Sequence, residues 1–282
     1  MKKKLIVSLS LLILVVFNSR ADEVVWMRSL EDAKVLSQAM NKPILLDFWA
    51  HWCGPCKKMD SKVWSTDEIK ELMKNFIPVK IDIDIDQEIS RRYSVKSIPT
   101  IIVTDSWGNQ LYKETGYKDK KRISELLTNF SVNLAGINRV SLVLFKKQDH
   151  VGSNVRVAQK HQDYGFLLKK DAKVAFIRRS NYYLRKAKKY NKGSGNLVLD
   201  ERIDLLKMLN KSYMGSPKSV LKKIDKSFKS VAVKNQGLFY FVKYYSAHAS
   251  KNTALKNEML AKLNSREMYK LYLKKTQKYG EL

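Results

Sequence analysis

Apolar and polar residues follow different periods along the chain, and these periods predict helices and strands. Residues 44–50 form a nearly unbroken apolar run, which is typical of a strand covered on both faces of a sheet. Apolar and charged residues alternate over 77–84, which predicts a second strand. Apolar residues at helical spacing predict a helix over 29–41. The other elements expected in this half are helices at 65–75, 87–93 and 118–130, and strands at 100–104 and 110–114.

Two local signals place the ends of these elements. Ser65-Thr66-Asp67-Glu68 has the pattern of a capping box, so we expect it to open the helix over 65–75. Trp107-Gly108-Asn109 separates the last two strands and predicts a hairpin turn. Strand, helix, strand, helix, hairpin and helix in this order predict an α/β sandwich over 22–133.

The second half of the chain has the pattern of an all-α domain. Residues 134–282 show no strong strand alternation, and glycine-containing breaks occur at 193–195 and 215–217. The helices predicted from apolar spacing are 171–190, 197–208, 217–228, 238–249 and 254–273. We therefore expect a helical bundle or an irregular helical repeat that begins at 134, with the boundary within 131–136.

The first residues have the pattern of a signal peptide. Lysines at positions 2–4 precede an apolar run of 13 residues, and the small residues Ser19 and Ala21 follow it. A membrane-spanning helix needs about 20 apolar residues, so the run is short for a retained anchor, which is the alternative. We expect residues 1–21 to be cleaved off near Ala21, which predicts a periplasmic or secreted protein of a bacterial cell envelope.

Charge divides the chain at the same boundary. The chain has 54 Lys and Arg against 27 Asp and Glu, a formal net charge of +27. Residues 22–130 hold 17 of each sign, whereas residues 131–282 hold 33 basic and 10 acidic residues. This basic domain predicts an anionic surface or an acidic protein as partner, and export argues against nucleic acid. Lysine enrichment on solvated helix faces is the alternative.

Cys53 and Cys56 are the only cysteines, which excludes a disulfide-stapled framework and a four-cysteine metal site. They follow the apolar strand at an expected helix start, where free backbone N–H groups favour a thiolate at Cys53. Pro55 suits the first turn of that helix. We predict that Cys53 attacks a partner and that Cys56, more enclosed, resolves the mixed disulfide.

Three other interpretations of the cysteine pair stay open. The first is a structural disulfide, but a loop this short would constrain little of the unfolded chain. Half of a zinc site would need two further ligands, and the four histidines offer no paired spacing. Buried, inert thiols are the third. We expect no metal and no cofactor beyond the Cys53–Cys56 disulfide.

The segment 47–57, DFWAHWCGPCK, closely resembles the active-site segment of thioredoxin. Ser97-Ile98-Pro99-Thr100 resembles that family's cis-proline loop, and Gly116 stands where the family also has a glycine. Stretches within 57–84 are closer to a secreted subfamily, which includes the periplasmic C-terminal domain of the membrane thiol:disulfide interchange reductase. The resemblance covers residues 24–130, implies a thioredoxin-like sandwich there, and says nothing about residues 131–282.

The resemblance also implies roles for single residues. Cys53 matches the family nucleophile and Cys56 its resolving cysteine. Pro99 would be cis and lie against the disulfide, and Ile98 would offer backbone hydrogen bonds to an extended substrate. The residues expected to meet the substrate are Trp52, Gly54, Pro55, Ile98 and Pro99.

Asp47 is a carboxylate within the apolar strand. Burial of a charged group is costly and should raise the pKa of this carboxyl. The resemblance implies that Asp47 relays a proton for Cys56, and that Lys80 lies beside it. A partly solvated aspartate at the strand end is the alternative.

These residues predict an exported thiol–disulfide oxidoreductase. Gly54-Pro55 between the cysteines matches reducing thioredoxins, which favours reduction of protein disulfides. His51 stands where an acidic residue is common in the family, and a protonated imidazole there would stabilise the thiolate. The expected partners are disulfide-containing envelope proteins and a membrane or soluble thiol electron donor. The alternatives are an oxidase or isomerase, and a binding or scaffold protein without catalysis.

Overall fold

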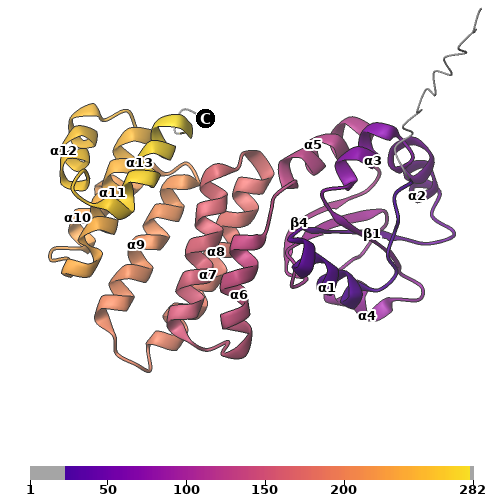
Figure 1. Cartoon of the computed structure of the whole chain (residues 1–282), viewed down its shortest axis with the longest axis horizontal. Helices are drawn as coiled ribbons and strands as arrows, with labels where there is room; N and C mark the ends of the chain where they lie inside the picture. Colours follow the sequence, from indigo (N-terminus) through magenta and orange to yellow (C-terminus); the bar gives the residue numbers. More distant parts are fainter. Residues whose placement is uncertain (1–22, 280–282) are drawn as a thin grey trace, which may run out of the picture.

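The computed structural model describes residues 23–279, which form a sheet lobe and a helical lobe (Figure 1). The predicted signal peptide lies outside the described residues. The sheet has the strand order β2-β1-β3-β4, in which β1 is parallel to β2 and antiparallel to β3, and β3 is antiparallel to β4. The strands are β1 Ile44–Trp49, β2 Ile77–Asp82, β3 Thr100–Thr104 and β4 Gln110–Thr115.

Helices cover both faces of this sheet, which explains the apolar run in β1. Ile44, Leu46 and Phe48 pack on the face that α1 covers. Leu45 packs on the opposite face, against the chain that follows the cysteines and against α5. Because side chains alternate along a strand, Asp47 shares the face of Leu45. The helices of this lobe are α1 Leu30–Met40, α2 Gly54–Met59, the π-helical turn η1 Asp60–Trp64, α3 Asp67–Met73, α4 Gln87–Arg92 and α5 Lys120–Phe130.

The predicted capping box is wrong. Thr66, not Ser65, is the N-cap of α3, and its side chain makes no capping hydrogen bond. The Ser65 hydroxyl instead donates to the Ser61 carbonyl at 2.9 Å, and the Thr66 hydroxyl donates to the Val63 carbonyl at 2.8 Å. These hydroxyls therefore donate to carbonyls of the preceding π-helical turn, and neither accepts an N–H from the first turn of α3.

The second lobe is helical throughout, so the all-α prediction is confirmed. Its helices are α6 Ala135–Lys146, α7 Val151–Leu167, α8 Lys170–Asn191, α9 Leu197–Tyr213, α10 Pro217–Ser227, α11 Val233–Ala249, α12 Thr253–Leu263 and α13 Glu267–Tyr279. The single helix predicted over 254–273 is two helices, because the chain turns at Asn264 and Ser265, whose side chains compete with the helical backbone. No helix among residues 23–279 has the length and apolar content needed to cross a membrane.

Sequence periodicity did not predict α6 and α7. Helix α7 buries the polar residues Asn154, His161 and Gln162, which breaks the apolar spacing that marks a helix in sequence. Inside the lobe each of these side chains has at least one partner, and the Gln162 side chain, for example, donates to the Leu206 carbonyl at 3.0 Å. Asn154 Oδ1 and His161 Nε2 stay without a partner within residues 23–279.

One apolar cluster runs from the sheet lobe into the helical lobe. Leu126 and Phe130 of α5 belong to the same buried cluster as Ile137 of α6 and Phe176 of α8. The backbone N–H of Leu134 also donates to the Asn41 carbonyl at 2.8 Å. The expected boundary at 131–136 thus falls between α5 and α6, but the side chains across it are packed together.

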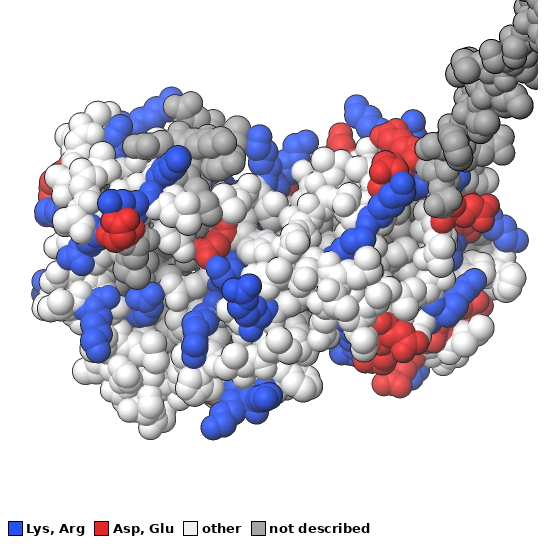
Figure 2. All heavy atoms as spheres, viewed as in Figure 1, with Lys and Arg blue, Asp and Glu red and all other residues white. Residues whose placement is uncertain are grey.

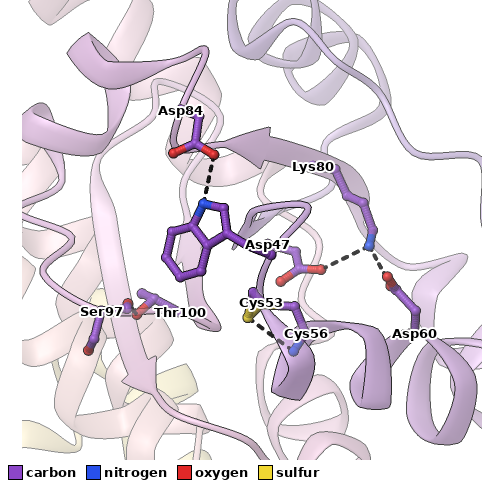
Figure 3. The surroundings of a disulfide bond; sticks show 9 residues. Asp47, Cys53, Cys56, Asp60, Lys80, Asp84, Ser97 and Thr100 are labelled. Carbon is purple, nitrogen blue, oxygen red and sulfur yellow. Dashed lines mark hydrogen bonds and ion pairs between the residues drawn. A yellow bond between two sulfur atoms is a disulfide. The ribbon is translucent and has the colours of Figure 1, made fainter.

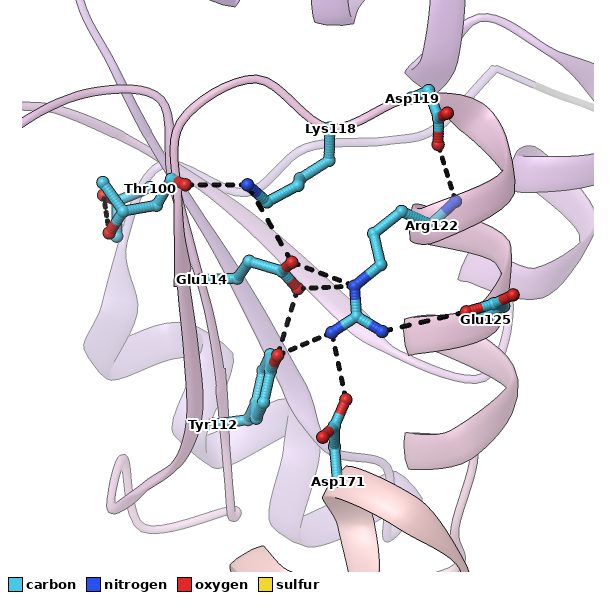
Figure 4. Close-up of polar contacts among 9 residues, drawn as sticks. Thr100, Tyr112, Glu114, Lys118, Asp119, Arg122, Glu125 and Asp171 are labelled. Carbon is cyan, nitrogen blue, oxygen red and sulfur yellow. Dashed lines mark hydrogen bonds and ion pairs between the residues drawn. The ribbon is translucent and has the colours of Figure 1, made fainter.

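An ionic cluster around Arg122 lies at the edge of this junction (Figure 4). The Nε of Arg122 donates to Glu114 of β4 at 2.9 Å, and the Nη2 of Arg122 donates to Asp171 of α8 at 3.0 Å. Hydrogen bonds to Glu114 and Asp171 raise the pKa of this guanidinium, opposed by partial burial. All three side chains are partly exposed, so this cluster adds less to the junction than the apolar contacts do.

Candidate active site

Cys53 and Cys56 lie at the N-terminal end of α2 and form a disulfide. Strand β1 ends at Trp49, and Cys53 follows as the N-cap residue of α2. Its sulfur accepts the backbone N–H of Cys56 at 3.1 Å, one of the donors that a helix start leaves free. The same donors and the helix dipole would stabilise a Cys53 thiolate after reduction.

Burial does not distinguish the two cysteines. Each is 3% exposed, so the expectation that Cys56 is the more enclosed one is wrong. Both belong to a small apolar cluster with Ala50, packed against Trp49 and the cis-proline loop. What separates them is position: Cys53 precedes the first helical turn and Cys56 lies within it.

The surface around the disulfide is open. Trp52 is 67% exposed, and its indole Nε1 donates to the Asp84 carboxylate at 2.9 Å (Figure 3). Gly54 and Pro55 are exposed, and a Cβ atom added at Gly54 would meet no atom within 4 Å. A partner chain could therefore approach the disulfide over Gly54 and Pro55, beside the held indole ring.

The loop before β3 lies against the disulfide. The Ile98–Pro99 peptide bond is cis, and the Ile98 side chain packs against the cysteine cluster. The Thr100 hydroxyl donates to the Ser97 carbonyl at 2.7 Å, and the Pro99 carbonyl accepts the N–H of Gly116 at 2.8 Å. Ile98 itself makes no hydrogen bond within residues 23–279, so its backbone is available to an added strand.

A buried ionic group lies under the disulfide-bearing helix. Asp47 of β1 pairs in register with Lys80 of β2, and their Oδ2 and Nζ atoms are 3.5 Å apart. The same Nζ donates to Asp60 in η1 (Figure 3). The ammonium group also lies 5.2 Å from the ring centroids of both Trp26 and Trp49, which act as cation–π partners.

This arrangement moves the titration of Asp47 toward neutral pH. Burial raises the pKa of Asp47 to about 6; Lys80 opposes the shift, and the Asp60 charge adds to it. Near pH 6 the carboxyl can therefore accept or release a proton. Asp60 was not among the predicted site residues, although it follows Cys56 by four residues, one helical turn along the same face.

The structure thus brings the predicted site residues to one place, with the disulfide between the cis-proline loop and the Asp47–Lys80 pair. His51 is exposed, and its ring centroid lies 5.3 Å from that of Trp49. Among residues 23–279, no group of three or more His, Cys, Asp and Glu side chains is arranged to hold a metal ion.

Comparisons with known proteins place residues 30–131 in the thioredoxin-like domain family. A thioredoxin of Mycoplasmoides gallisepticum is 38% identical over 87 residues, which are 31% of this chain and 83% of that protein. The thiol:disulfide interchange protein DsbD of Yersinia pestis is 30% identical over 101 residues, 34% of this chain but only 17% of that protein. A solved thioredoxin from Thermus thermophilus aligns with a TM-score of 0.35 and 21% identity, covering 38% of this chain and 86% of the other.

Proposed function

The chain belongs to the thioredoxin family, and from this we propose that it is an exported oxidoreductase that reduces disulfide bonds in other proteins. The observation that carries the proposal is the Cys53–Cys56 disulfide at the start of α2, packed against Ile98 of the cis-proline loop and near the buried Asp47. The family supplies the general chemistry, thiol–disulfide exchange. Export, the direction of electron flow and the roles of single residues are proposals.

The reaction starts from the reduced pair and proceeds in two exchanges. In the first, the Cys53 thiolate attacks one sulfur of a substrate disulfide; the substrate S–S bond breaks, and the other substrate sulfur leaves as a thiolate. In the second, the Cys56 thiolate attacks the Cys53 sulfur, which forms the intramolecular disulfide and releases the first substrate sulfur. Two electrons have then passed to the substrate, and a thiol electron donor must reduce the pair again.

Three neighbouring groups support these steps. The backbone of Ile98 would hold an extended substrate segment across the disulfide, as an added strand does. Trp52, Gly54 and Pro55 would form the rest of the contact surface. Asp47, with a pKa of about 6, would take the proton of Cys56 as its thiolate forms for the second exchange.

Reduction of insulin disulfides by dithiothreitol tests this proposal. The protein should accelerate the reduction, and Cys53→Ser should abolish the acceleration. Cys56→Ser is the matched control, because it keeps the attacking sulfur and should accumulate a mixed disulfide without turnover. Unchanged activity in Cys53→Ser would contradict the mechanism; full partner binding and full biological effect in that variant would favour the scaffold alternative.

The direction of electron flow is tested by the reduction potential of the pair. A reductase should have a potential near that of thioredoxin, roughly −270 mV, whereas a strong oxidant of this chemistry lies at roughly −120 mV. Equilibration with glutathione buffers measures the value. A potential near roughly −120 mV would favour the oxidase or isomerase alternative.

We propose that the helical lobe determines where the chain acts, by binding an anionic surface. Figure 2 shows Lys and Arg spread over this lobe with few Asp or Glu, whereas both signs mix on the sheet lobe. Sedimentation with vesicles of anionic lipid should carry the protein down at low salt and release it as salt rises. Equal sedimentation with neutral vesicles would contradict a charge-based interaction.

Export is proposed from the sequence of residues 1–21 alone. Expressed in a bacterium, the full chain should be recovered from the envelope fraction with an N-terminus near residue 22, as mass spectrometry of the intact protein would show. Recovery of the uncleaved chain from the cytoplasm would contradict export.

A further inference from the structure

A cleft of about 320 Å³ opens where the two lobes meet, away from the disulfide. Arg92 of α4 and Trp107 of the hairpin turn line it from the sheet lobe, and Phe145 of α6 and Arg179 of α8 line it from the helical lobe. The turn follows the end of β3, whereas Pro99 precedes its start. The strand alone separates them by roughly 15 Å, so this cleft is distinct from the proposed substrate surface.

Positive charge dominates the cleft. Arg92, Arg179 and Lys186 line it, and within residues 23–279 neither Arg179 nor Lys186 forms a salt bridge. Asp105 is the carboxylate that faces Arg179, but it is buried, and its Oδ1 accepts the backbone N–H groups of Trp107 and Asn109 at 2.9 Å. It therefore offsets one of the three cations, and Glu31, 4.0 Å from Arg92, offsets part of a second. Lys186 has no such carboxylate within residues 23–279, so the cleft keeps an attraction for anions.

Two side chains of the cleft wall each have a buried N–H group without an acceptor. The Nε of Arg179 and the indole Nε1 of Trp107 are inaccessible to solvent and form no hydrogen bond within residues 23–279. Buried N–H groups are paired in the great majority of cases, and an unpaired one costs free energy. Because solvent does not reach these two atoms, a ligand in the cleft would meet the Nη nitrogens of Arg179, one of which donates to the Tyr183 hydroxyl at 3.3 Å.

The remaining wall is aromatic. Trp107 stacks on Phe145 with ring centroids 5.2 Å apart, and Phe145 is nevertheless 65% exposed. Tyr182 lies under both cations of α8, with Arg179 at 4.5 Å and Lys186 at 5.6 Å from its ring centroid. Exposed flat rings beside cations offer a ligand ring both stacking partners and a cationic face.

We propose that this cleft binds a small organic anion in which a carboxylate or phosphate group is attached to an aromatic ring. The oxyanion would lie against the Arg179 guanidinium and the Lys186 ammonium, while the ring would lie against Phe145 and Tyr182. The volume is at the lower end of the range for ligand sites, roughly 300–1,000 Å³, so it fits one small molecule. Because both lobes line the cleft, such a ligand would also hold them together.

The test is a titration of the ¹⁵N-labelled full chain followed by NMR of its indole N–H groups. Phenyl phosphate and benzoate are the probes, and phenol and inorganic phosphate carry the ring and the anion separately. We expect at least one ring-bearing anion to shift the Trp107 indole signal with roughly millimolar affinity, and at least about tenfold more tightly than either fragment. The Trp107 indole resonance is assigned as the signal that is missing from the spectrum of Trp107→Phe.

Variants of α8 decide whether the cleft is responsible. Lys186→Met and Arg179→Met should each weaken binding of the probe about tenfold or more, because each removes a charged partner of the oxyanion. Lys189→Met is the matched control, since Lys189 is exposed on the same helix and outside the cleft. If Arg179→Met does not fold, Lys186→Met carries the test.

Three results would overturn the proposal: an unmoved Trp107 signal with both ring-bearing anions, inorganic phosphate binding as tightly as phenyl phosphate, or unchanged affinity in Lys186→Met. Insulin reduction is measured in parallel and should be the same in Lys186→Met as in the unchanged protein. If the unchanged protein did not reduce insulin, the proposed reductase function would be wrong, but the result on ligand binding in the cleft would still hold.

Discussion

The two lobes each bury a titratable group, and they do so in opposite ways. In the sheet lobe, Asp47 is buried beside Lys80 and Asp60, and its pKa is raised to about 6. In the helical lobe, His161 is fully buried among aromatic rings, its Nδ1 lies 2.8 Å from the Val157 carbonyl, and burial lowers its pKa to about 3. Burial moves the pKa of Asp47 toward physiological pH, with Lys80 opposing the shift and Asp60 adding to it, whereas burial holds His161 neutral and its ring serves the packing.

The surfaces of the lobes differ as well, yet their interiors join. Charges of both signs balance over residues 22–130, and basic residues dominate residues 131–282. The buried cluster that contains Leu127 of α5 nevertheless includes Ile137 and Phe176 of the helical lobe. The lobes therefore differ in chemistry and surface charge, but we expect them to unfold as coupled units.

The largest expected effect comes from Phe176→Ala. Phe176 is fully buried in the cluster that joins the lobes, so its truncation should cost about 3–5 kcal/mol of unfolding free energy. All five tryptophans lie in the sheet lobe, so their fluorescence reports on that lobe, while far-UV circular dichroism reports mainly on the helical lobe. Both urea transitions should move.

Phe241→Ala is the matched control for this variant. Phe241 is buried in the separate cluster inside the helical lobe, so its truncation should shift the dichroism transition more than the fluorescence transition. If Phe176→Ala left the fluorescence transition in place, the lobes would be independent and the coupling described above would be wrong.

Asp47→Asn should give the next largest change in the free energy of unfolding, and the change should stabilise the fold at neutral and higher pH. The folded pKa of Asp47 is raised above the unfolded value of 3.8, so the unfolded chain releases this proton first as pH rises. The protonated Asp47 therefore contributes to the free energy of unfolding at low pH. This contribution is lost between about pH 4 and about pH 6, and it amounts to at most about 3 kcal/mol. The oxidised Asp47→Asn variant should therefore be more stable than the unchanged protein at pH 8 and similar at pH 4.

Urea unfolding at the two pH values measures this difference, and other titrating groups cancel in the comparison. Asp82→Asn is a suitable control, because Asp82 lies at the end of β2 and is only partly buried. A pH-independent difference between Asp47→Asn and the unchanged protein would show that the carboxyl does not titrate as described.

The sheet lobe was predictable because its signals are local. The apolar run over 44–50 and the alternation over 77–84 each mark one strand, and β1 and β2 end within two residues of the expected positions. In the site, the spacing of Cys53 and Cys56 at a helix start is also local. Asp60 was missed because its role depends on Lys80, which reaches it from another strand.

The helical lobe was less predictable for a physical reason. Helix α7 places the polar residues Asn154 and His161 inside the lobe, so its sequence does not look amphipathic. Their partners there are the carbonyls of Gln148 and Val157. The cleft at the junction could not be predicted at all. Trp107 and Arg179 lie far apart in sequence, and only the packing of α8 on the sheet lobe brings them together.

His161 should give a pH slope of the opposite sign to that of Asp47. The pKa of His161 is lowered in the folded state, so below about pH 6.5 its ring is protonated in the unfolded chain but stays neutral in the folded chain. Stability present above that pH is then lost as pH falls toward about 3, at about 1.4 kcal/mol per pH unit, or about 2 kcal/mol from pH 6.5 to pH 5.

His161→Gln should remove this loss, which thermal or urea unfolding between pH 7 and pH 5 would measure. His51→Gln is the control, because His51 is exposed in the other lobe and its replacement should leave the slope in place. Since Asp47 acts in the opposite direction over the same interval, the unchanged protein should show a smaller net slope than Asp47→Asn. Identical slopes in His161→Gln and the unchanged protein would mean that His161 is protonated inside the fold.

The smallest expected effect is that of Asp171→Asn, which cuts the ion pair between the lobes. Arg122 and Asp171 are 3.0 Å apart but partly exposed, and Arg122 keeps its contacts with Glu114, so the loss should stay below about 1 kcal/mol and disappear at high salt. Asp225→Asn, which cuts the 2.9 Å pair with Lys243 inside the helical lobe, should behave alike. A loss above about 2 kcal/mol for Asp171→Asn alone would mean that the ionic cluster, and not the apolar contacts around Phe176, holds the lobes together.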